Sequence, residues 1–114
     1  MNLNPDVMLA SSVLTKGTHH ATVALMGGFD WDEAKNASLE RTRGVSFEDV
    51  VFHIHNGDVL DILRHPNESR YPDQRIIVLH MEGYVYLVPY VKQQGTRFLK
   101  TIIPSRKATR EYLK

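Results

Sequence analysis

The segment TRFLKTIIPSRKATREYL, residues 96–113, organises the C-terminal half of the chain. It predicts a β-strand over residues 96–103, a stop at Pro104 and a short helix capped by Ser105, because Ser is a preferred N-cap. Arg106 and Lys107 occupy the first turn of that helix, where the helix dipole disfavours cations by roughly 0.3–1 kcal/mol. A helix start already attracts anions, so these cations indicate either a phosphate-binding site or a solvated basic helix end.

The residues upstream of this segment predict a β-meander. Residues 75–81 and 84–91 are rich in Val, Ile, Leu and Tyr, and they flank Glu82-Gly83, which suits a two-residue hairpin turn. Such a turn pairs Val78 with Leu87 and Arg75 with Tyr90. Residues 93–95 predict the next turn, residues 58–63 a shorter strand, and residues 65–74 a loop.

Alternation along the strands divides this sheet into two faces. The face expected against the helices carries Val85, Leu87, Val91, Ile76, Val78, His80, Leu99, Thr101 and Ile103. The other face, expected to be open, carries Tyr84, Tyr86, Tyr90, Arg75, Phe98, Lys100 and Ile102. Tyrosines interleaved with Lys and Arg can stack bases and neutralise phosphates. The same face could equally pack against a partner protein, because Tyr is enriched at protein interfaces.

Two helices are expected before the sheet. Asp30 is the predicted N-cap of a helix over residues 31–43, which ends at Gly44. Ser46 and Asp49 form a capping box for a second helix with a clean apolar stripe, and Asn56 lies where that helix ends. The predicted fold class is α+β, with two N-terminal helices, an antiparallel meander of about four strands and a short C-terminal helix.

Composition sets further bounds on the protein. Its 114 residues suit one domain, predicted over residues 28–114, with residues 1–27 as an N-terminal extension that includes a weak strand over 21–25. The absence of cysteine excludes disulfides and thiolate metal sites. His19 and His20 are adjacent, so their side chains diverge, and we expect no metal and no cofactor. No apolar run approaches the roughly 20 residues that span a bilayer, and the N-terminus does not resemble a signal peptide, so a cytoplasmic protein without membrane contact is expected.

Charge is distributed unevenly along the chain. Residues 28–60 contain three Lys and Arg against seven Asp and Glu, a net charge of −4. Residues 61–114 contain ten Lys and Arg against five Asp and Glu, a net charge of +5. This polarity indicates an anionic ligand on the basic part, with nucleic acid as the first candidate.

Two separated blocks, FDWDEAKNASLERTRGVSFEDV (residues 29–50) and KTIIPSRKATREYL (residues 100–113), resemble the BrnT family of toxins from bacterial type II toxin–antitoxin pairs. The resemblance implies a fold similar to RelE-type ribonucleases and a small ribonuclease that inhibits translation. It also implies neutralisation by an antitoxin with a ribbon-helix-helix or similar DNA-binding part, so that operator DNA is contacted only through the antitoxin. Arg43 stands where the family commonly has a histidine, and Pro104 where an apolar residue is commoner.

Two functions remain open from the sequence. In the first, the chain is a metal-independent endoribonuclease, which needs a base, an acid and cations that stabilise charge on the phosphate. The candidate catalytic residues are Arg106, Lys100, Arg75, Tyr86 and His80, and the candidate RNA-binding residues are Arg97, Lys107, Arg110, Tyr84 and Tyr90. In the second, the chain is a non-catalytic interaction module that binds an antitoxin-like or DNA-binding partner. The unclear acid–base pair and the histidine replaced by Arg43 favour this second hypothesis.

Overall fold

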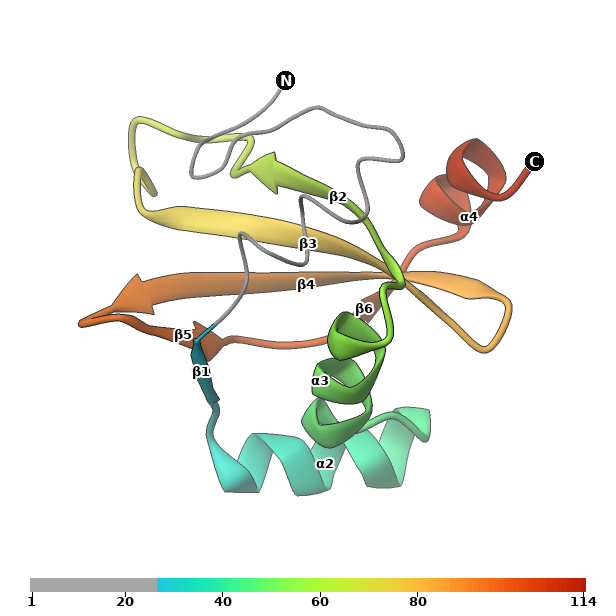
Figure 1. Cartoon of the computed structure of the whole chain (residues 1–114), viewed down its shortest axis with the longest axis horizontal. Coiled ribbons are helices and arrows are strands. Elements are labelled where there is room, and N and C mark those ends of the chain that lie inside the picture. Colours follow the sequence, from blue (N-terminus) through green and yellow to red (C-terminus); the bar gives the residue numbers. More distant parts are fainter. Residues whose placement is uncertain (1–26) are drawn as a thin grey trace.

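The computed structural model describes residues 27–114 (Figure 1). The strand predicted over residues 21–25, and the histidines at positions 19 and 20, lie outside this range. None of the helices in the described range is long and apolar enough to cross a membrane.

The fold class is α+β, as predicted, but the sheet is larger than expected and mixed. Its strand order is β1-β5-β4-β3-β2, and β6 pairs with β4 beyond the end of β5. β1 runs parallel to β5, and the other pairs are antiparallel. The elements are β1 (Gly28–Asp30), α2 (Glu33–Arg43), α3 (Phe47–His55), β2 (Val59–Arg64), β3 (Gln74–Met81), β4 (Tyr84–Gln93), β5 (Thr96–Leu99), β6 (Ile103–Pro104) and α4 (Arg106–Tyr112).

The first helix begins later than predicted. Asp30 is the last residue of β1, and its Oδ1 accepts a hydrogen bond from the Trp31 amide (2.8 Å). The N-cap of α2 is Asp32, whose side chain accepts from the Ala34 amide. Asp30 and Asp32 are both suitable N-cap residues. Because Asp30 pairs with β5 as part of β1, the helix begins after Asp32.

The second helix is built as the sequence predicts. The Ser46 Oγ accepts from the Asp49 amide (3.1 Å), and the Asp49 Oδ2 accepts from the Ser46 amide (3.0 Å), which completes the capping box. Asn56 is the C-cap. The cap Ser105 of α4 is confirmed in the same way, since its Oγ accepts from the Ala108 amide (3.0 Å).

Both hairpin turns use left-handed backbone. Glu82 (φ 53°) and Gly83 (φ 78°) join β3 to β4, and the predicted pairings of Val78 with Leu87 and Arg75 with Tyr90 are confirmed. Gln94 (φ 49°) and Gly95 (φ 82°) join β4 to β5. Positive φ at both central residues matches the twist of a tight hairpin, which explains the Gly at each second position.

The last predicted strand is interrupted after Leu99. The chain leaves the ladder at residues 100–102 and rejoins β4 as β6. Ile102 turns into the core and is fully buried, whereas Ile103 is 40% exposed, which is the reverse of the expected alternation. Arg43 donates to the Ile102 carbonyl (2.6 Å), so the residue that departs from the resembled family satisfies a backbone group freed by the break.

The helices α2 and α3 cover the tyrosine face of the sheet, so the predicted assignment of faces was wrong (Figure 1). Ile77, Leu79, Met81 and Val88 share this face with the tyrosines, and each is at most 2% exposed. These four residues and Tyr90 belong to the larger of the two buried cores, and the Tyr86 ring packs against it. The helices contribute Leu39, Val45, Phe47, Val50 and Ile54.

The opposite face of the sheet is covered in part by α4. Val78, Val85 and Ala108 form a second, smaller core, with Leu60, Leu87 and Leu113 packed against it. Leu99 pairs with Tyr90 and therefore lies on the first face, contrary to expectation, while Phe98 lies on the second. Lys100 is exposed and outside the ladder, and its amide donates to the Pro89 carbonyl (2.8 Å).

Candidate functional sites

The predicted open tyrosine face is not present. Tyr90 is 7% exposed, and Tyr84 and Tyr86 are half-buried with their rings in an edge contact at 5.7 Å. Burial, and then the neighbouring Tyr84 and Glu82, raise the pKa of Tyr86 above its ordinary value of 10.0. Its hydroxyl therefore stays protonated at neutral pH, which makes Tyr86 a poor general base.

Three of the predicted site residues meet at the end of the sheet remote from the β3–β4 turn. Arg75 pairs with Tyr90, and the Arg97 guanidinium carbon lies 6.0 Å from the centroid of the Tyr90 ring. Register adds two residues that the sequence did not suggest, because Arg64 lies opposite Arg75 and Lys92 lies opposite Arg97. We call Arg64, Arg75, Lys92 and Arg97, grouped around Tyr90, the basic end.

The loop after β2 lies directly against the basic end. Arg64 forms a salt bridge with Glu68, and the Arg75 Nη1 donates to the carbonyls of Pro72 (2.9 Å) and Gln74 (3.2 Å). Tyr71 in this loop is 39% exposed. Its ring lies 4.4 Å from that of His65 and 5.6 Å from the Arg70 guanidinium carbon. The one arginine of this loop, Arg70, therefore lies beside an exposed aromatic ring.

A histidine–carboxylate pair lies at the other end of the sheet. The Nδ1 of His53, in the last turn of α3, is 2.7 Å from the Oδ2 of Asp58, just before β2. The Asn56 side-chain amide donates to the same oxygen (3.0 Å). The His80 backbone amide donates to the Asp58 carbonyl (3.0 Å), and the charge of the His80 ring is close enough to help lower the pKa of the Asp58 carboxyl. Two imidazoles therefore lie near one carboxylate, and we call His53, Asp58 and His80 the acid–base group.

The carboxylate of Asp58 stays ionised in this environment. Burial alone would raise its pKa, but hydrogen bonds from Asn56 and His53, with the charges of His53 and His80, outweigh burial and lower it. An ionised Asp58 favours a proton on the His53 Nδ1, which leaves the Nε2 able to accept one. This tautomer is inferred from the hydrogen-bond pattern.

The basic residues of α4 form a third location. Arg106, Lys107 and Arg110 are all exposed, as is Lys100. The helix is attached beside the acid–base group, since His80 pairs with Val85, and Val85 accepts from the Ser105 amide (3.0 Å) and donates to the Thr109 hydroxyl (2.9 Å). The predicted site residues are thus divided among three places, and Arg75 lies on the opposite face from His80.

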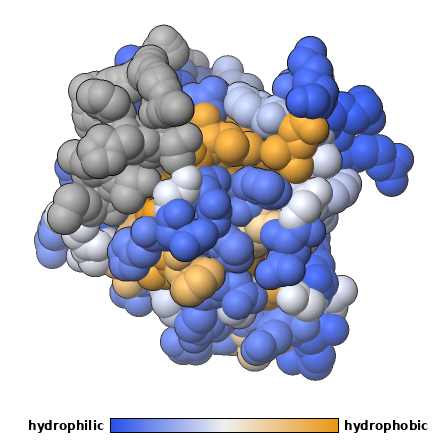
Figure 2. All heavy atoms as spheres, turned by 45° about the vertical axis from the view of Figure 1, so that its right-hand side comes forward, coloured by the Kyte–Doolittle hydropathy of each residue, from blue (hydrophilic) through white to orange (hydrophobic). Residues whose placement is uncertain are grey.

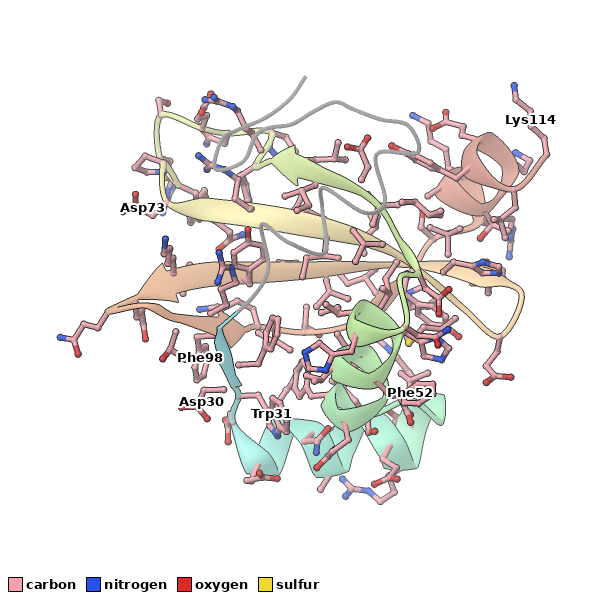
Figure 3. All side chains as sticks on the ribbon, in the orientation of Figure 1. Asp30, Trp31, Phe52, Asp73, Phe98 and Lys114 are labelled. Carbon is pink, nitrogen blue, oxygen red and sulfur yellow. The ribbon has the colours of Figure 1, made fainter. Side chains whose placement is uncertain are left out.

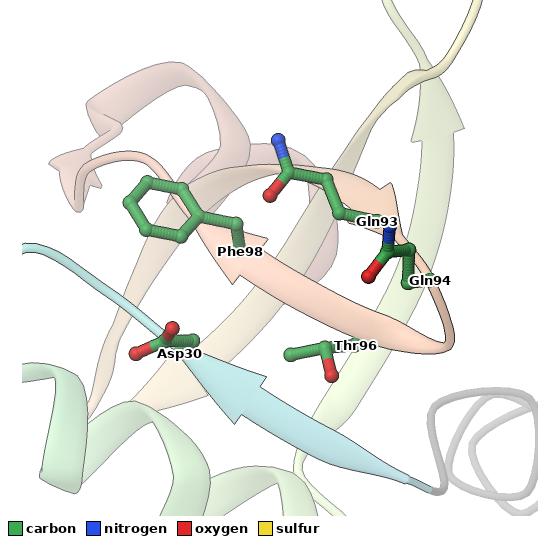
Figure 4. Close-up of a pocket in the computed structure, with 5 residues that line it drawn as sticks. All are labelled: Asp30, Gln93, Gln94, Thr96 and Phe98. Carbon is green, nitrogen blue, oxygen red and sulfur yellow. The ribbon is translucent and has the colours of Figure 1, made fainter.

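A hollow of about 570 Å³ opens at the β1–β5 side of the sheet (Figure 4). It is lined by Asp30, Gln93, Gln94, Thr96 and Phe98. Asp30 and Phe98 are neighbours in the parallel β1–β5 register and lie close together in Figure 3. No local sequence pattern predicts this hollow, because it depends on the parallel pairing of β1 with β5.

Within residues 27–114, no group of three or more His, Asp or Glu side chains is arranged to hold a metal ion. Sequence reasoning missed Lys92 as a site residue. Its position opposite Arg97 follows from a two-residue turn at Gln94-Gly95, so this pairing could have been predicted. The position of Arg64 opposite Arg75 could not have been predicted, because the long loop between β2 and β3 leaves the register of these strands undetermined. His53 and Asp58 are five positions apart across a helix end, a spacing without a known signature.

Comparisons with known proteins do not assign the chain to a family. It matches no protein-family model, no curated protein and no solved structure.

Proposed function

We propose that the chain is the toxin of a type II toxin–antitoxin pair and cleaves RNA without a metal ion. The observation that carries this proposal is the acid–base group, in which the Asp58 carboxylate holds His53, while the His80 backbone bonds to that of Asp58 and the His80 charge helps to lower the Asp58 pKa. RNA cleavage without a metal needs a proton acceptor and a proton donor, and two imidazoles are the side chains best suited to both tasks near neutral pH.

The proposed reaction is an internal transesterification. The His53 Nε2 removes the proton from a ribose 2′-hydroxyl, whose oxygen attacks the adjacent phosphorus. The new O2′–P bond forms as the P–O5′ bond breaks, and His80 in its protonated form donates a proton to the departing O5′. The products are a 2′,3′-cyclic phosphate and a 5′-hydroxyl, and the net proton count on the protein is unchanged.

The charge that develops on the phosphate requires cations nearby. Arg106, Arg110 and Lys100 are exposed, and α4 is attached to the strand next to His80. Cations held beside a phosphoryl group stabilise its transition state. In this proposal they bind the scissile phosphate, and Lys107 contacts a neighbouring one.

The proposal includes a RelE-like arrangement and an antitoxin partner. After β1, the helices α2 and α3 precede the remaining strands and α4 follows them, and this part of the order supports a RelE-like arrangement. The partner is an antitoxin with a ribbon-helix-helix or similar DNA-binding part, through which the pair reaches operator DNA in the cytoplasm.

The test is cleavage of a 5′-labelled RNA by the purified chain, with and without EDTA. We expect cleavage in both, with a 2′,3′-cyclic phosphate end, and a loss of about 10²-fold or more in rate for His53→Gln or His80→Gln. His55→Gln is the matched control, since His55 is an exposed histidine of the same helix that does not contact Asp58. Absence of cleavage, or equal effects of all three substitutions, would overturn the proposal.

A second candidate is the non-catalytic interaction module, and the exposure of Phe52 favours it. Phe52 is 63% exposed on α3, where Glu48 and Asp49 lie one turn earlier (Figure 3). Figure 2 shows that hydrophobic residues also gather in a patch on an otherwise mostly hydrophilic face. Phe52→Ser should abolish co-purification with the antitoxin under either function. Only the interaction module predicts an uncombined chain that leaves RNA intact and growth unaffected.

A further inference from the structure

The basic end contains two like-charged pairs in direct cross-strand register. Arg64 lies opposite Arg75 on β2 and β3, and Lys92 lies opposite Arg97 on β4 and β5. Opposite-charge pairs at such positions stabilise a sheet, while like charges directly opposite each other destabilise it. Both pairs lie on the same face, on either side of Tyr90.

The described residues supply little counter-charge to Arg64, Arg75 and Lys92. Glu68 pairs with Arg64, but within residues 27–114 no acidic side chain forms a salt bridge with Arg75 or Lys92. Arg64, Arg75 and Lys92 lie on three neighbouring strands, and together they give this end of the sheet a positive local potential that attracts an anionic ligand.

The chemistry next to the cations narrows the class of anion. Tyr71 is exposed beside Arg70 and His65, in a loop that Arg75 holds through the Pro72 carbonyl. Proteins that bind single-stranded nucleic acid combine a positive groove with aromatic rings on which bases stack. Inorganic phosphate or a small anion would use the cations and leave the ring without a role.

We propose that the basic end binds the phosphate backbone of single-stranded RNA through Arg64, Arg75 and Lys92, and that Tyr71 stacks on one of its bases. The proposal rests on the proposed function for the choice of RNA, but not on cleavage. β2 joins the two sites, with Arg64 at its end and Asp58 just before its start. Six residues at about 3.3 Å each separate them by roughly 20 Å. The basic end therefore holds RNA several nucleotides from the bond that the acid–base group would cleave.

The test is fluorescence anisotropy of the full chain with a labelled, single-stranded 2′-O-methyl RNA of twelve nucleotides, which cannot undergo attack by the 2′-hydroxyl. We expect Arg64→Gln combined with Lys92→Gln to weaken binding by about tenfold at low salt and to lower the slope of log K against log salt by about 0.7 for each lost phosphate contact. Both side chains are exposed, so the variant should fold. Lys35→Gln combined with Arg41→Gln on α2 is the control with the same change in charge.

A second variant tests the choice of RNA. Tyr71→Ala should weaken binding of the single strand by about fivefold to 150-fold, the equivalent of about 1–3 kcal/mol for stacking, while binding of inorganic polyphosphate stays unchanged. Equal losses in the basic-end and α2 variants, or no effect of Tyr71→Ala on the single strand, would overturn the inference. A chain that binds in this pattern but does not cleave RNA would overturn the proposed function and leave the inference standing. If cleavage is lost in His53→Gln but RNA binding does not depend on the basic end, the proposed function stands and the inference is overturned.

Discussion

Asn36 connects the two N-terminal helices through a single side chain. It is 6% exposed, its Oδ1 accepts from the Phe47 amide (2.7 Å), and its Nδ2 donates to the Glu48 Oε1 (2.7 Å). The Phe47 amide is buried at the start of α3, so it has no water to replace the lost acceptor. We predict that Asn36→Ala lowers the free energy of unfolding by about 1–3 kcal/mol, measured by urea denaturation.

Glu48→Gln is the control for this substitution. It changes the exposed partner of Asn36 and leaves the buried bond to Phe47 intact, so its effect should stay below about 1 kcal/mol. Equal losses in the two variants would show that the buried amide is not what Asn36 stabilises.

Asp58 gives the structure a dependence on pH that can be assigned to one residue. Its folded-state pKa is lowered below the ordinary value of 3.8. The ionised carboxylate therefore contributes stability that is fully present above that value and is lost as the pH falls through the lower, folded-state pKa. We predict that Asp58→Asn destabilises the chain near neutral pH and that the difference from wild type shrinks below pH 3.8. Urea denaturation at a series of pH values measures this difference, and a constant difference down to pH 2, roughly, would contradict the assignment.

Among the helices, the two serine N-caps differ in how much of the hydrophobic core the capped helix contributes. Ser46 is 5% exposed and begins a helix whose Phe47, Val50 and Ile54 are fully buried in the main core. Ser105 makes an equivalent bond at the start of α4, which contributes only Ala108 to the smaller core. We predict that Ser46→Ala lowers the free energy of unfolding by about 0.5–2 kcal/mol. Ser105→Ala should instead mainly increase hydrogen exchange of the α4 amides, and a reversed order of global effects would contradict this view.

The β3–β4 turn carries strain that a single substitution can relieve. Glu82 has a positive φ of 53°, and left-handed backbone costs a typical side chain about 1–2 kcal/mol but Asn much less. Glu82→Asn would also create the Asn-Gly sequence that this turn type prefers. We predict a gain of up to about 1 kcal/mol in the free energy of unfolding, measured by thermal denaturation. Glu82→Val should act in the opposite direction, because a β-branched side chain tolerates this backbone poorly.

Local patterns predicted most of these elements, and failed where the decision depended on distant parts of the chain. The capping box of α3 and the register across Glu82-Gly83 are local, and both are confirmed. The faces were assigned wrongly because both faces of β4 are apolar: Val85 and Leu87 alternate with Tyr86 and Val88. Only the placement of two helices on one side and of α4 on the other separates them.

The candidate sites show the same division. The resemblance and the charge pattern directed attention to α4 and to Arg75, which the structure places on different faces. The basic end, and the position of His80 beside Asp58, arise from register between strands, and a single sequence does not reveal the register across a nine-residue loop such as 65–73. His80 was suggested by the sequence, but its neighbour Asp58 was not.

At the scale of the whole molecule, one sheet separates two cores of unequal size. Phe47 is fully buried in the core beneath α2 and α3, whereas Ala108 docks α4 on Val78 and Val85 on the other face. A hydrogen bond also holds α4 to β2, since the Tyr112 hydroxyl donates to the Asp61 Oδ2 (2.9 Å). Substitutions in the two cores should therefore differ in how far they unfold the protein.

We predict that Phe47→Ala destabilises the whole domain by about 3–5 kcal/mol, because the vacated space cannot be refilled by the rigid sheet and helices around it. Ala108→Asp places a charge against Val78 and Val85, and α4 can escape the desolvation cost by detaching. Hydrogen exchange followed by NMR should then show lost protection in α4, with the amides of α3 and β3 still protected. If Ala108→Asp unfolded the main core as well, the two faces would form one cooperative unit. Under the proposed function, the detached α4 would also carry Arg106 and Arg110 away from the acid–base group, so RNA cleavage should be lost while RNA binding at the basic end persists.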